Sequence, residues 1–284
     1  MRQPIVAGQF YSNDFDKLNK SIETSFENGP GASPIDKRDK NILGVIVPHS
    51  KYDYCGKCMA WAYKEIGESE YPDSYIILGG VHSSFSDFGM MSLRDFTSPF
   101  GLVKTDKDTV NRLGSDVLKI NEDVHDDEHS IEVQLPFLQF VSKEMIKMTP
   151  ILLSSKKYEV IKSISDKICA LDKNLVIIAS SDLVHYGKLY SYTPFKFNVK
   201  KEIDNVNRKA IELICDLDTK GFLKFIEDTN ANICGAGAIA VLMEIIKKKK
   251  RDKGKLLDYY NSGDVNKDYE NFVGYGSIVF GKSL

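Results

Sequence analysis

No stretch of this sequence approaches the roughly 20 consecutive apolar residues that a membrane-spanning helix needs. The first residues, MRQPIVAGQFYS, also lack the apolar core of a secretory signal peptide. We therefore expect a cytoplasmic protein with no membrane partner. An excess of positive charge is absent too, because 38 basic and 40 acidic residues give a formal net charge of -2. The one basic run, residues 247–255, suits the solvated end of a helix, so nucleic acid is not an expected partner.

Cysteine is scarce, with five residues in a chain of 284. The odd number does not suggest a disulfide framework and fits a reducing compartment. Cys55 and Cys58 form a C-x-x-C pair, but no second pair completes a zinc site, so we expect both to pack in the core from one helix face. The Walker loop and the G-x-S-x-G elbow are also missing. A G-x-G-x-x-A string at 235–240 lacks the preceding strand of a dinucleotide site.

Short runs of Ile, Val and Leu alternate with longer stretches of helical period, and 42% of the residues are hydrophobic. This pattern predicts one three-layer α/β/α domain, residues 1–284, with a mainly parallel central sheet. The predicted strands are residues 42–48, 74–80, 148–154, 175–181 and 274–281, with an edge strand within 88–96. The predicted helices are residues 55–67, 106–119, 130–145, 158–171, 199–214, 218–228 and 235–250, and the best loop is 26–40.

Three of the predicted strands are followed directly by a histidine. His49 comes two residues after the apolar run that ends at Val47, His82 follows a Gly-Gly pair, and Asp182 and His185 follow the run that ends at Ala179. The carboxyl ends of parallel strands meet at one edge of the sheet, where α/β proteins place their ligand sites. A lone histidine is usually structural, but three at one edge indicate a functional site.

Cys234, in NICGAGAIAVLMEI, stands just before a strong helical pattern. A helix N-terminus favours the thiolate, which suits a metal ligand or a nucleophile, although a small buried residue at a helix start would look the same. Two reaction types stay open. A metal centre would take His49, His82 and Cys234 as ligands, with Asp182 and His185 nearby. A metal-independent hydrolase would instead pair His185 with a serine and orient it with Asp182; the serine candidates are Ser83, Ser84 and Ser181.

The segment DDEHSIEVQLPFLQF, residues 126–140, surrounds a histidine with carboxylates and then becomes apolar. We expect the carboxylates and Ser130 to stabilise a helix start and Pro136 to bend or interrupt that helix. His129, at the junction, is predicted to point toward the site as a catalytic or substrate-contacting group. His125 is predicted to lie on the surface with no role.

Six motifs follow one another from residue 2 to residue 239: RQPIVAGQFYS, VPHSKYDYCG, LGGVH, DDEHSIEVQLPFLQ, SSDLVHYG and CGAGAI. Together they closely resemble the Memo family, whose microbial and archaeal members are called AmmeMemoRadiSam system protein B. The resemblance implies a fold similar to that of the class III extradiol dioxygenases, which hold non-haem iron at the end of an α/β sheet. Its implied metal ligands are His49, His82 and Cys234, and its implied catalytic residues are His185, Asp182 and His129.

The resemblance also carries expectations about chemistry and partners. It implies Fe(II) or copper as cofactor and a redox or oxygenase-like activity on an unidentified substrate, with Cys234 in place of the dioxygenase carboxylate. The implied partners are an AmmeCR-type protein and a radical SAM protein, or phosphotyrosine-like peptides. A peptide- or protein-binding module that uses the same pocket without turnover is the alternative, and the sequence does not indicate an oligomeric state.

Overall fold

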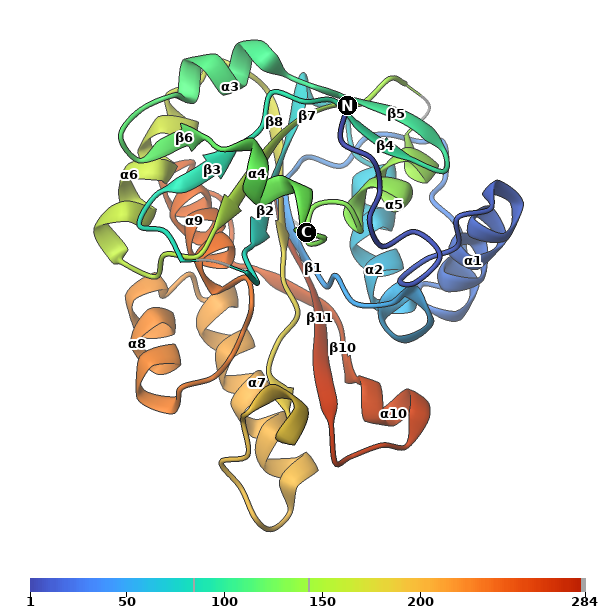
Figure 1. Cartoon of the computed structure of the whole chain (residues 1–284), viewed down its shortest axis with the longest axis vertical. Coiled ribbons are helices and arrows are strands. Elements are labelled where there is room, and N and C mark those ends of the chain that lie inside the picture. The colour runs from blue at the N-terminus through green and yellow to red at the C-terminus, as the bar shows by residue number, and fades with distance from the viewer. Residues whose placement is uncertain (84, 143, 282–284) are drawn as a thin grey trace.

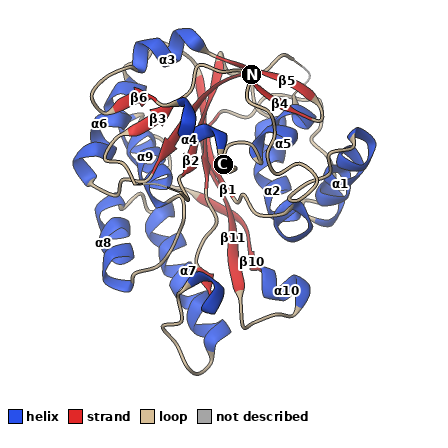
Figure 2. Ribbon diagram, in the orientation of Figure 1, coloured by secondary structure: helices blue, strands red, loops and turns tan. Residues whose placement is uncertain are grey.

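A twisted sheet runs through the middle of the molecule, with helices on both sides (Figures 1 and 2). The computed structural model describes residues 1–83, 85–142 and 144–281. The strands are β1 (Ile42–Val47), β2 (Ser74–Gly80), β3 (Gly89–Met91), β4 (Phe96–Ser98), β5 (Gly101–Thr105), β6 (Leu118–Ile120), β7 (Lys147–Leu153), β8 (Leu175–Ser180), β9 (His185–Tyr186), β10 (Lys255–Asn261) and β11 (Phe272–Gly281).

The main path of the sheet has the order β10-β11-β1-β8-β2-β7-β3-β6. Its centre, β1-β8-β2-β7, is parallel, whereas β11 pairs antiparallel with β1 and with β10, and β3 pairs antiparallel with β7. The sheet is therefore mixed around a parallel core. Every residue of β1, β2 and β8 is buried, which explains why these strands read as continuous apolar runs.

Helices cover the two faces of the sheet, and the sheet lies between two apolar cores. One core joins the sheet to α6, α7, α8 and α9, and the other joins it to α1, α2 and α5 (Figure 1). The helices are α1 (Phe15–Asn28), α2 (Tyr52–Gly67), α3 (Lys107–Leu113), α4 (Glu122–Asp126), α5 (Gln134–Val141), α6 (Tyr158–Cys169), α7 (Val199–Cys215), α8 (Thr219–Thr229), α9 (Ala236–Lys248) and α10 (Ser262–Asn266), with a 3-10 turn, η1, at Lys188–Tyr190. The three-layer α/β/α prediction is confirmed.

The predicted strands at 42–48, 74–80, 148–154, 175–181 and 274–281 are all present, and the helices at 55–67, 158–171, 199–214, 218–228 and 235–250 are confirmed to within one turn. The predicted edge strand within 88–96 is β3, but β6 pairs on its outer side, so it does not form the edge. No helix in the described part of the chain is both long and apolar enough to cross a membrane.

Two predicted helices have the wrong extent. The prediction for 106–119 fails after Leu113, because Gly114 ends α3, a turn joins Ser115 to Leu118, and β6 follows. The prediction for 130–145 starts too early and ends too late, since α5 runs from Gln134 to Val141. Pro136 is the third residue of α5, where a missing N–H costs no helical hydrogen bond, so it lies in the first turn and does not bend the helix.

The sequence patterns did not predict α1 or β10. Leu18, Ile22 and Phe26 of α1 are fully buried at helical spacing, and Asp14 caps its start. The predicted loop 26–40 therefore begins later, because residues 26–28 close this helix. β10 carries only two buried residues at its end, and its sequence, KLLDYYN, is neither a continuous apolar run nor a regular polar/apolar alternation, so it gave a weak strand signal.

Candidate metal centre

The carboxyl ends of three adjacent parallel strands bring the candidate residues together. β1 ends at Val47 and leads to His49, β2 ends at Gly80 and leads to His82, and β8 ends at Ser180 and leads to the segment of Asp182 and His185. The backbone N–H of Ser181 donates to the carbonyl of Val47, so the chain segments that leave β1 and β8 stay joined past the sheet.

Cys234 reaches the same place from the short connection between α8 and α9, two helices that cover one face of the sheet. Two glycines allow its close approach. A Cβ atom at Gly80 would lie 2.6 Å from the carbonyl oxygen of Cys234, and one at Gly235 would lie 2.6 Å from the carbonyl oxygen of Ser180. The glycines of the LGGVH and CGAGAI motifs therefore let two backbones meet at the strand ends.

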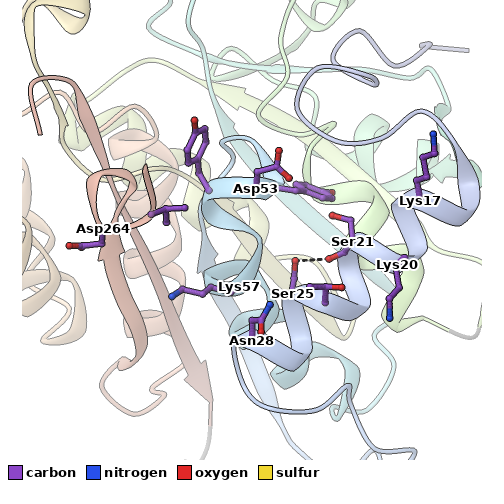
Figure 3. Close-up of a pocket in the computed structure, with 12 residues that line it drawn as sticks. Lys17, Lys20, Ser21, Ser25, Asn28, Asp53, Lys57 and Asp264 are labelled. Carbon is purple, nitrogen blue, oxygen red and sulfur yellow. Dashed lines mark hydrogen bonds between the residues drawn. The ribbon is translucent and has the colours of Figure 1, made fainter. Parts of the chain in front are cut away.

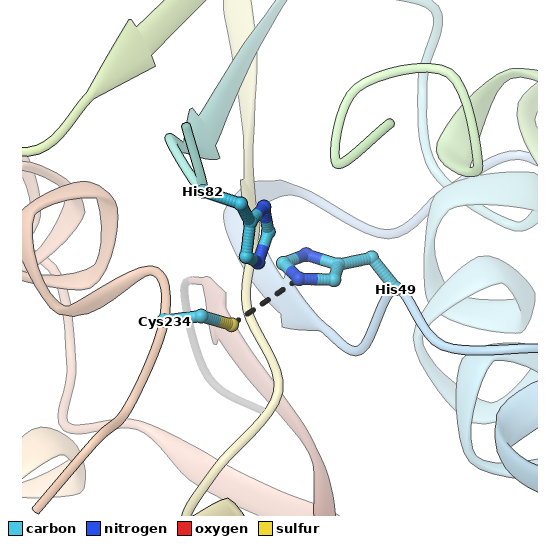
Figure 4. Close-up of side chains that lie close together, drawn as sticks. All are labelled: His49, His82 and Cys234. Carbon is cyan, nitrogen blue, oxygen red and sulfur yellow. Dashed lines mark hydrogen bonds between the residues drawn. The ribbon is translucent and has the colours of Figure 1, made fainter. Parts of the chain in front are cut away.

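His49, His82 and Cys234 form a compact group (Figure 4). Sγ of Cys234 lies 3.2 Å from Nε2 of His49, the two imidazole centroids are 5.3 Å apart, and one ligand atom from each of the three residues lies within 4.8 Å of the others. Two imidazoles and a thiol at this separation are a donor set suited to a soft or borderline transition metal.

The hydrogen bonds of Ser180 determine which nitrogen of His49 carries a proton. The Ser180 hydroxyl donates to the carbonyl of Ser130 at 2.6 Å and accepts the side-chain N–H of Gln134 at 2.8 Å. Its only proton is therefore used, and Nδ1 of His49, 3.0 Å away, must be the donor in their hydrogen bond. Nε2, the nitrogen that faces Cys234, is the one left to bind a metal ion.

Glu128 imposes the same arrangement on His82. Nδ1 of His82 lies 3.0 Å from each carboxylate oxygen of Glu128, and the backbone N–H of His82 donates to this carboxylate at 2.9 Å. An ionised carboxylate only accepts hydrogen bonds, so Nδ1 carries the proton and Nε2 is directed away from Glu128. Both histidines thus reserve Nε2 for the space beside the Cys234 sulfur.

The charges of the group match this arrangement. Burial opposes a thiolate at Cys234, but the neighbouring His49 cation holds the pKa of the thiol well below its usual range. Burial likewise opposes a cation at His82, yet the contacts with Cys234 and Glu128 raise its pKa to about 11. The metal-free group is a thiolate beside protonated imidazole, and the proton on Nε2 is the one that a metal ion would displace.

His129 lies against both candidate histidine ligands. Its ring stacks on His82 with centroids 4.7 Å apart and meets His49 edge-on at 5.5 Å, while Phe10 covers it from the N-terminal segment. Burial, followed by the nearby His49 cation, lowers the pKa of His129 to about 4. A neutral imidazole at the rim of the group can accept a proton or a hydrogen bond.

Asp182 and His185 lie beside Cys234, and one ligand atom from each of these three residues lies within 4.8 Å of the others. The Asp182 carboxylate accepts the backbone N–H of His49 at 2.9 Å and the hydroxyl of Ser50 at 2.8 Å, so it fixes the start of the His49 loop. Burial opposes its charge, but the His49 cation keeps the pKa of Asp182 far below the usual range. Nε2 of His185 is 3.7 Å from Asp182, and although burial opposes protonation, this carboxylate raises the pKa of His185. The ring of Tyr190 covers His185 at 5.1 Å.

His125 is not a surface residue, so that prediction was wrong. Its side chain is buried, its Nε2 hydrogen-bonds to the carbonyl of Met90 at 3.1 Å, and burial lowers its pKa to about 4. The buried Arg2 binds the same segment, since its guanidinium donates to the carbonyls of His125 and Glu128 and forms an ion pair with Glu132. The N-terminal RQPIVAGQFYS motif therefore anchors the loop that carries Glu128 and His129.

The other sequence predictions for this region have clear outcomes. Cys55 and Cys58 are fully buried on α2, as predicted, and burial raises the pKa of both thiols. The Ser181 hydroxyl donates to the carbonyl of Asp182 and accepts the N–H of Gly235, so it does not pair with His185. In the described part of the chain, the ring of His185 has no hydroxyl partner, and Ser84 lies outside that part.

Sequence reasoning missed the groups that orient the ligands. The sequence placed Glu128 at a helix start, but α5 begins six residues later. The Glu128 carboxylate instead accepts the N–H groups of His129 and Ser130 and binds His82. The only feature of the sequence that pointed to a role for Glu128 in the site was its position next to His129. Ser180 and Gln134 gave no signal beyond belonging to motifs that were singled out for their histidines.

A known protein family matches nearly the whole chain. The family described as Memo-like protein matches residues 2–279. The chain belongs to the Memo family. Three similar relatives are MEMO1 family proteins of Methanopyrus kandleri (36% identical; 98% of this chain and 98% of the relative), Sulfurisphaera tokodaii (35%; 99% and 99%) and Methanosarcina barkeri (33%; 98% and 99%). The Memo-family match thus spans all six motifs and every candidate ligand.

Proposed function

We propose that this Memo-family chain holds one Fe(II) or copper ion between Nε2 of His49, Nε2 of His82 and Sγ of Cys234. The observation that carries the proposal is the pair of fixed tautomers. Ser180 and Glu128 each occupy an Nδ1 position, so Nε2 of both imidazoles and one thiolate are directed into one small space. A buried thiol and two such histidines have little structural reason to be arranged in this way without a metal.

The proposed activity is redox or oxygenase-like chemistry on a small molecule. When bound, iron or copper supplies one-electron redox chemistry that no side chain in the group provides. The surrounding residues would handle protons and position. His185, whose cationic form Asp182 favours, is suited to donate a proton, whereas neutral His129 is suited to accept one. Asp182 itself acts as a positioning residue, because its oxygens are engaged by His49 and Ser50.

The partly exposed His82 gives substrate a route to the centre. Its side chain is 38% exposed, whereas His49 is buried beneath it. A molecule that approaches from solvent would therefore meet the face formed by His82 and His129 before it met His49.

A non-catalytic binding module remains the second proposal for the same pocket. The observation in its favour is Cys234, because a sulfur atom stands where the dioxygenases have a carboxylate ligand, so the donor set differs from that of the ring-cleaving enzymes. Tight binding of a phosphotyrosine peptide by metal-free protein, unchanged in Cys234→Ser, would favour this proposal over catalysis.

Elemental analysis of protein purified anaerobically without a metal-binding tag tests the metal proposal. We expect about one iron or copper ion per chain and loss of that ion in His49→Ala. His125→Gln is the matched control, since it removes a buried histidine outside the group. Full metal loading of His49→Ala would reject the proposed ligand set.

A further inference from the structure

A cavity of about 1110 Å³ lies beside Cys234, between α8, the loop that follows β2 and the connection from β7 to α6. Part of its wall is apolar and comes from Val81, Leu223, Ile226 and Ile233. Phe85 also lines it, although its side chain is 70% exposed. A cavity of this size and character accommodates the body of a small organic molecule.

Positive charge lines two sides of this cavity. Its charged residues are Lys156, Lys157, Lys220, Lys224 and Glu227. Lys157 pairs with Asp87 at 2.5 Å and Lys224 pairs with Asp228 at 2.9 Å, so two of the four ammonium groups are neutralised.

The other two lysines have no such compensation. In the described part of the chain, neither Lys156 nor Lys220 has a carboxylate oxygen within 4.0 Å, and the ammonium group of Lys220 lies 4.7 Å from the ring centroid of Tyr158. Lys156 extends from the segment after β7, whereas Lys220 belongs to the first turn of α8. Two uncompensated cations on separate walls, against one glutamate, favour an anionic ligand.

The cavity adjoins the candidate metal centre. Cys234 belongs to its wall, and so does Val81, the neighbour of His82 in the chain. A molecule held here would thus lie next to two of the three candidate ligands.

We propose that this cavity binds a small organic anion, a carboxylate or a phosphate carried on an apolar body, with the anionic group between Lys156 and Lys220. The apolar body would pack on Leu223, Ile226 and Ile233. This inference rests on the proposed function in one respect, because it makes such anions the substrate class of the metal centre. Binding itself needs no metal ion.

A second cavity provides a matched control. It has a volume of about 890 Å³, lies between α1, α2 and α10, and is lined by Lys17, Lys20 and Lys57 (Figure 3). It also contains lysines but includes none of the candidate metal ligands. Lys17→Gln/Lys20→Gln therefore removes the same charge as Lys156→Gln/Lys220→Gln, from a different part of the surface.

Isothermal titration calorimetry of the metal-free full chain tests the proposal with three probes of equal chain length: decanoate, decyl phosphate and decyltrimethylammonium, each below its micellar concentration. We expect the anions to bind and the cation not to bind. Lys156→Gln/Lys220→Gln should weaken anion binding about tenfold, since each exposed cation contributes modestly, and Lys17→Gln/Lys20→Gln should leave it unchanged. The tighter of the two anions identifies the head group.

Three results would overturn the inference. They are equal binding of the anions and the cation, no binding of any probe, and an unchanged anion affinity in Lys156→Gln/Lys220→Gln. The metal content of the same variant separates this result from the proposed function. If the variant loads metal like the wild type but loses anion binding, the result supports both the metal site and the anion-binding cavity. If the wild type binds the anions but takes up no metal, the result supports the cavity and rejects the metal site.

Discussion

The carboxylate of Glu128 holds His82 at two points, because it accepts both the ring Nδ1–H at 3.0 Å and the backbone N–H at 2.9 Å. The residues are 46 positions apart in the chain, and Glu128 is almost fully buried. This contact fixes the tautomer and the orientation of a candidate ligand, which is the usual task of a carboxylate behind a metal-binding histidine.

Glu128→Gln should therefore lower metal affinity about 10- to 100-fold, because an amide is a weaker acceptor and no longer enforces one tautomer. Competition against a chelator, with Co(II) as a spectroscopic probe, measures the change. Glu122→Gln is the control, since Glu122 binds Leu93 and Arg94 and not the ligand group. Wild-type affinity in Glu128→Gln would show that the contact does not tune the site.

The Cys234 thiol should react with iodoacetamide faster than the other cysteines at pH 7. Its pKa is depressed by the His49 cation despite burial, whereas burial raises the pKa of Cys55 and Cys58. Mass spectrometry of digests from a time course locates the modified residue, and Cys234→Ser is the control. Metal loading should suppress the reaction. Equal labelling of Cys234 and Cys55 would contradict the assigned thiolate.

Arg2→Met should lower the free energy of unfolding by about 3–5 kcal/mol, because it leaves the buried Glu132 without its cation. Chemical denaturation measures this loss. The double variant Arg2→Met/Glu132→Leu should recover part of the stability, since it removes both charges. Lys224→Met, which breaks an exposed ion pair with Asp228, should change stability by less than about 1 kcal/mol. If Arg2→Met lowers the free energy of unfolding no more than Lys224→Met does, the buried Arg2–Glu132 pair does not stabilise the fold.

His125 should make the fold sensitive to mild acid. Its pKa is about 4 in the folded chain and about 6.5 when exposed, so the unfolded chain binds the extra proton between these values. Its contribution to stability is complete above pH 6.5 and is lost as the pH falls toward 4. It amounts to about 2 kcal/mol between pH 7.5 and pH 5.

Urea unfolding at pH 7.5 and pH 5 measures that difference. His125→Gln cannot titrate, so its stability should fall less than that of the wild type over the same interval. An identical pH dependence in the two proteins would mean that His125 is not buried in its neutral form.

The strands and the histidines that follow them were predictable because parallel strands have strong apolar signals and a common carboxyl edge. His49, His82 and His185 come within a few residues of such a run, and Cys234 precedes an equally clear helix. The supporting groups were not predictable, since the contacts of Glu128 with His82 and of Arg2 with Glu132 join residues 46 and 130 positions apart. Nothing local to Glu128 distinguishes a histidine partner from a helix cap. Likewise, β10 depends on its pairing with β11 more than on its own sequence.

The central claim is that His49, His82 and Cys234 share one metal ion, and X-ray absorption spectroscopy of the anaerobically loaded protein tests it most directly. We expect a first coordination shell with one sulfur and two imidazole nitrogens from the protein, and loss of the sulfur in Cys234→Ser. A stoichiometrically bound ion with no sulfur ligand in the wild type would contradict the claim.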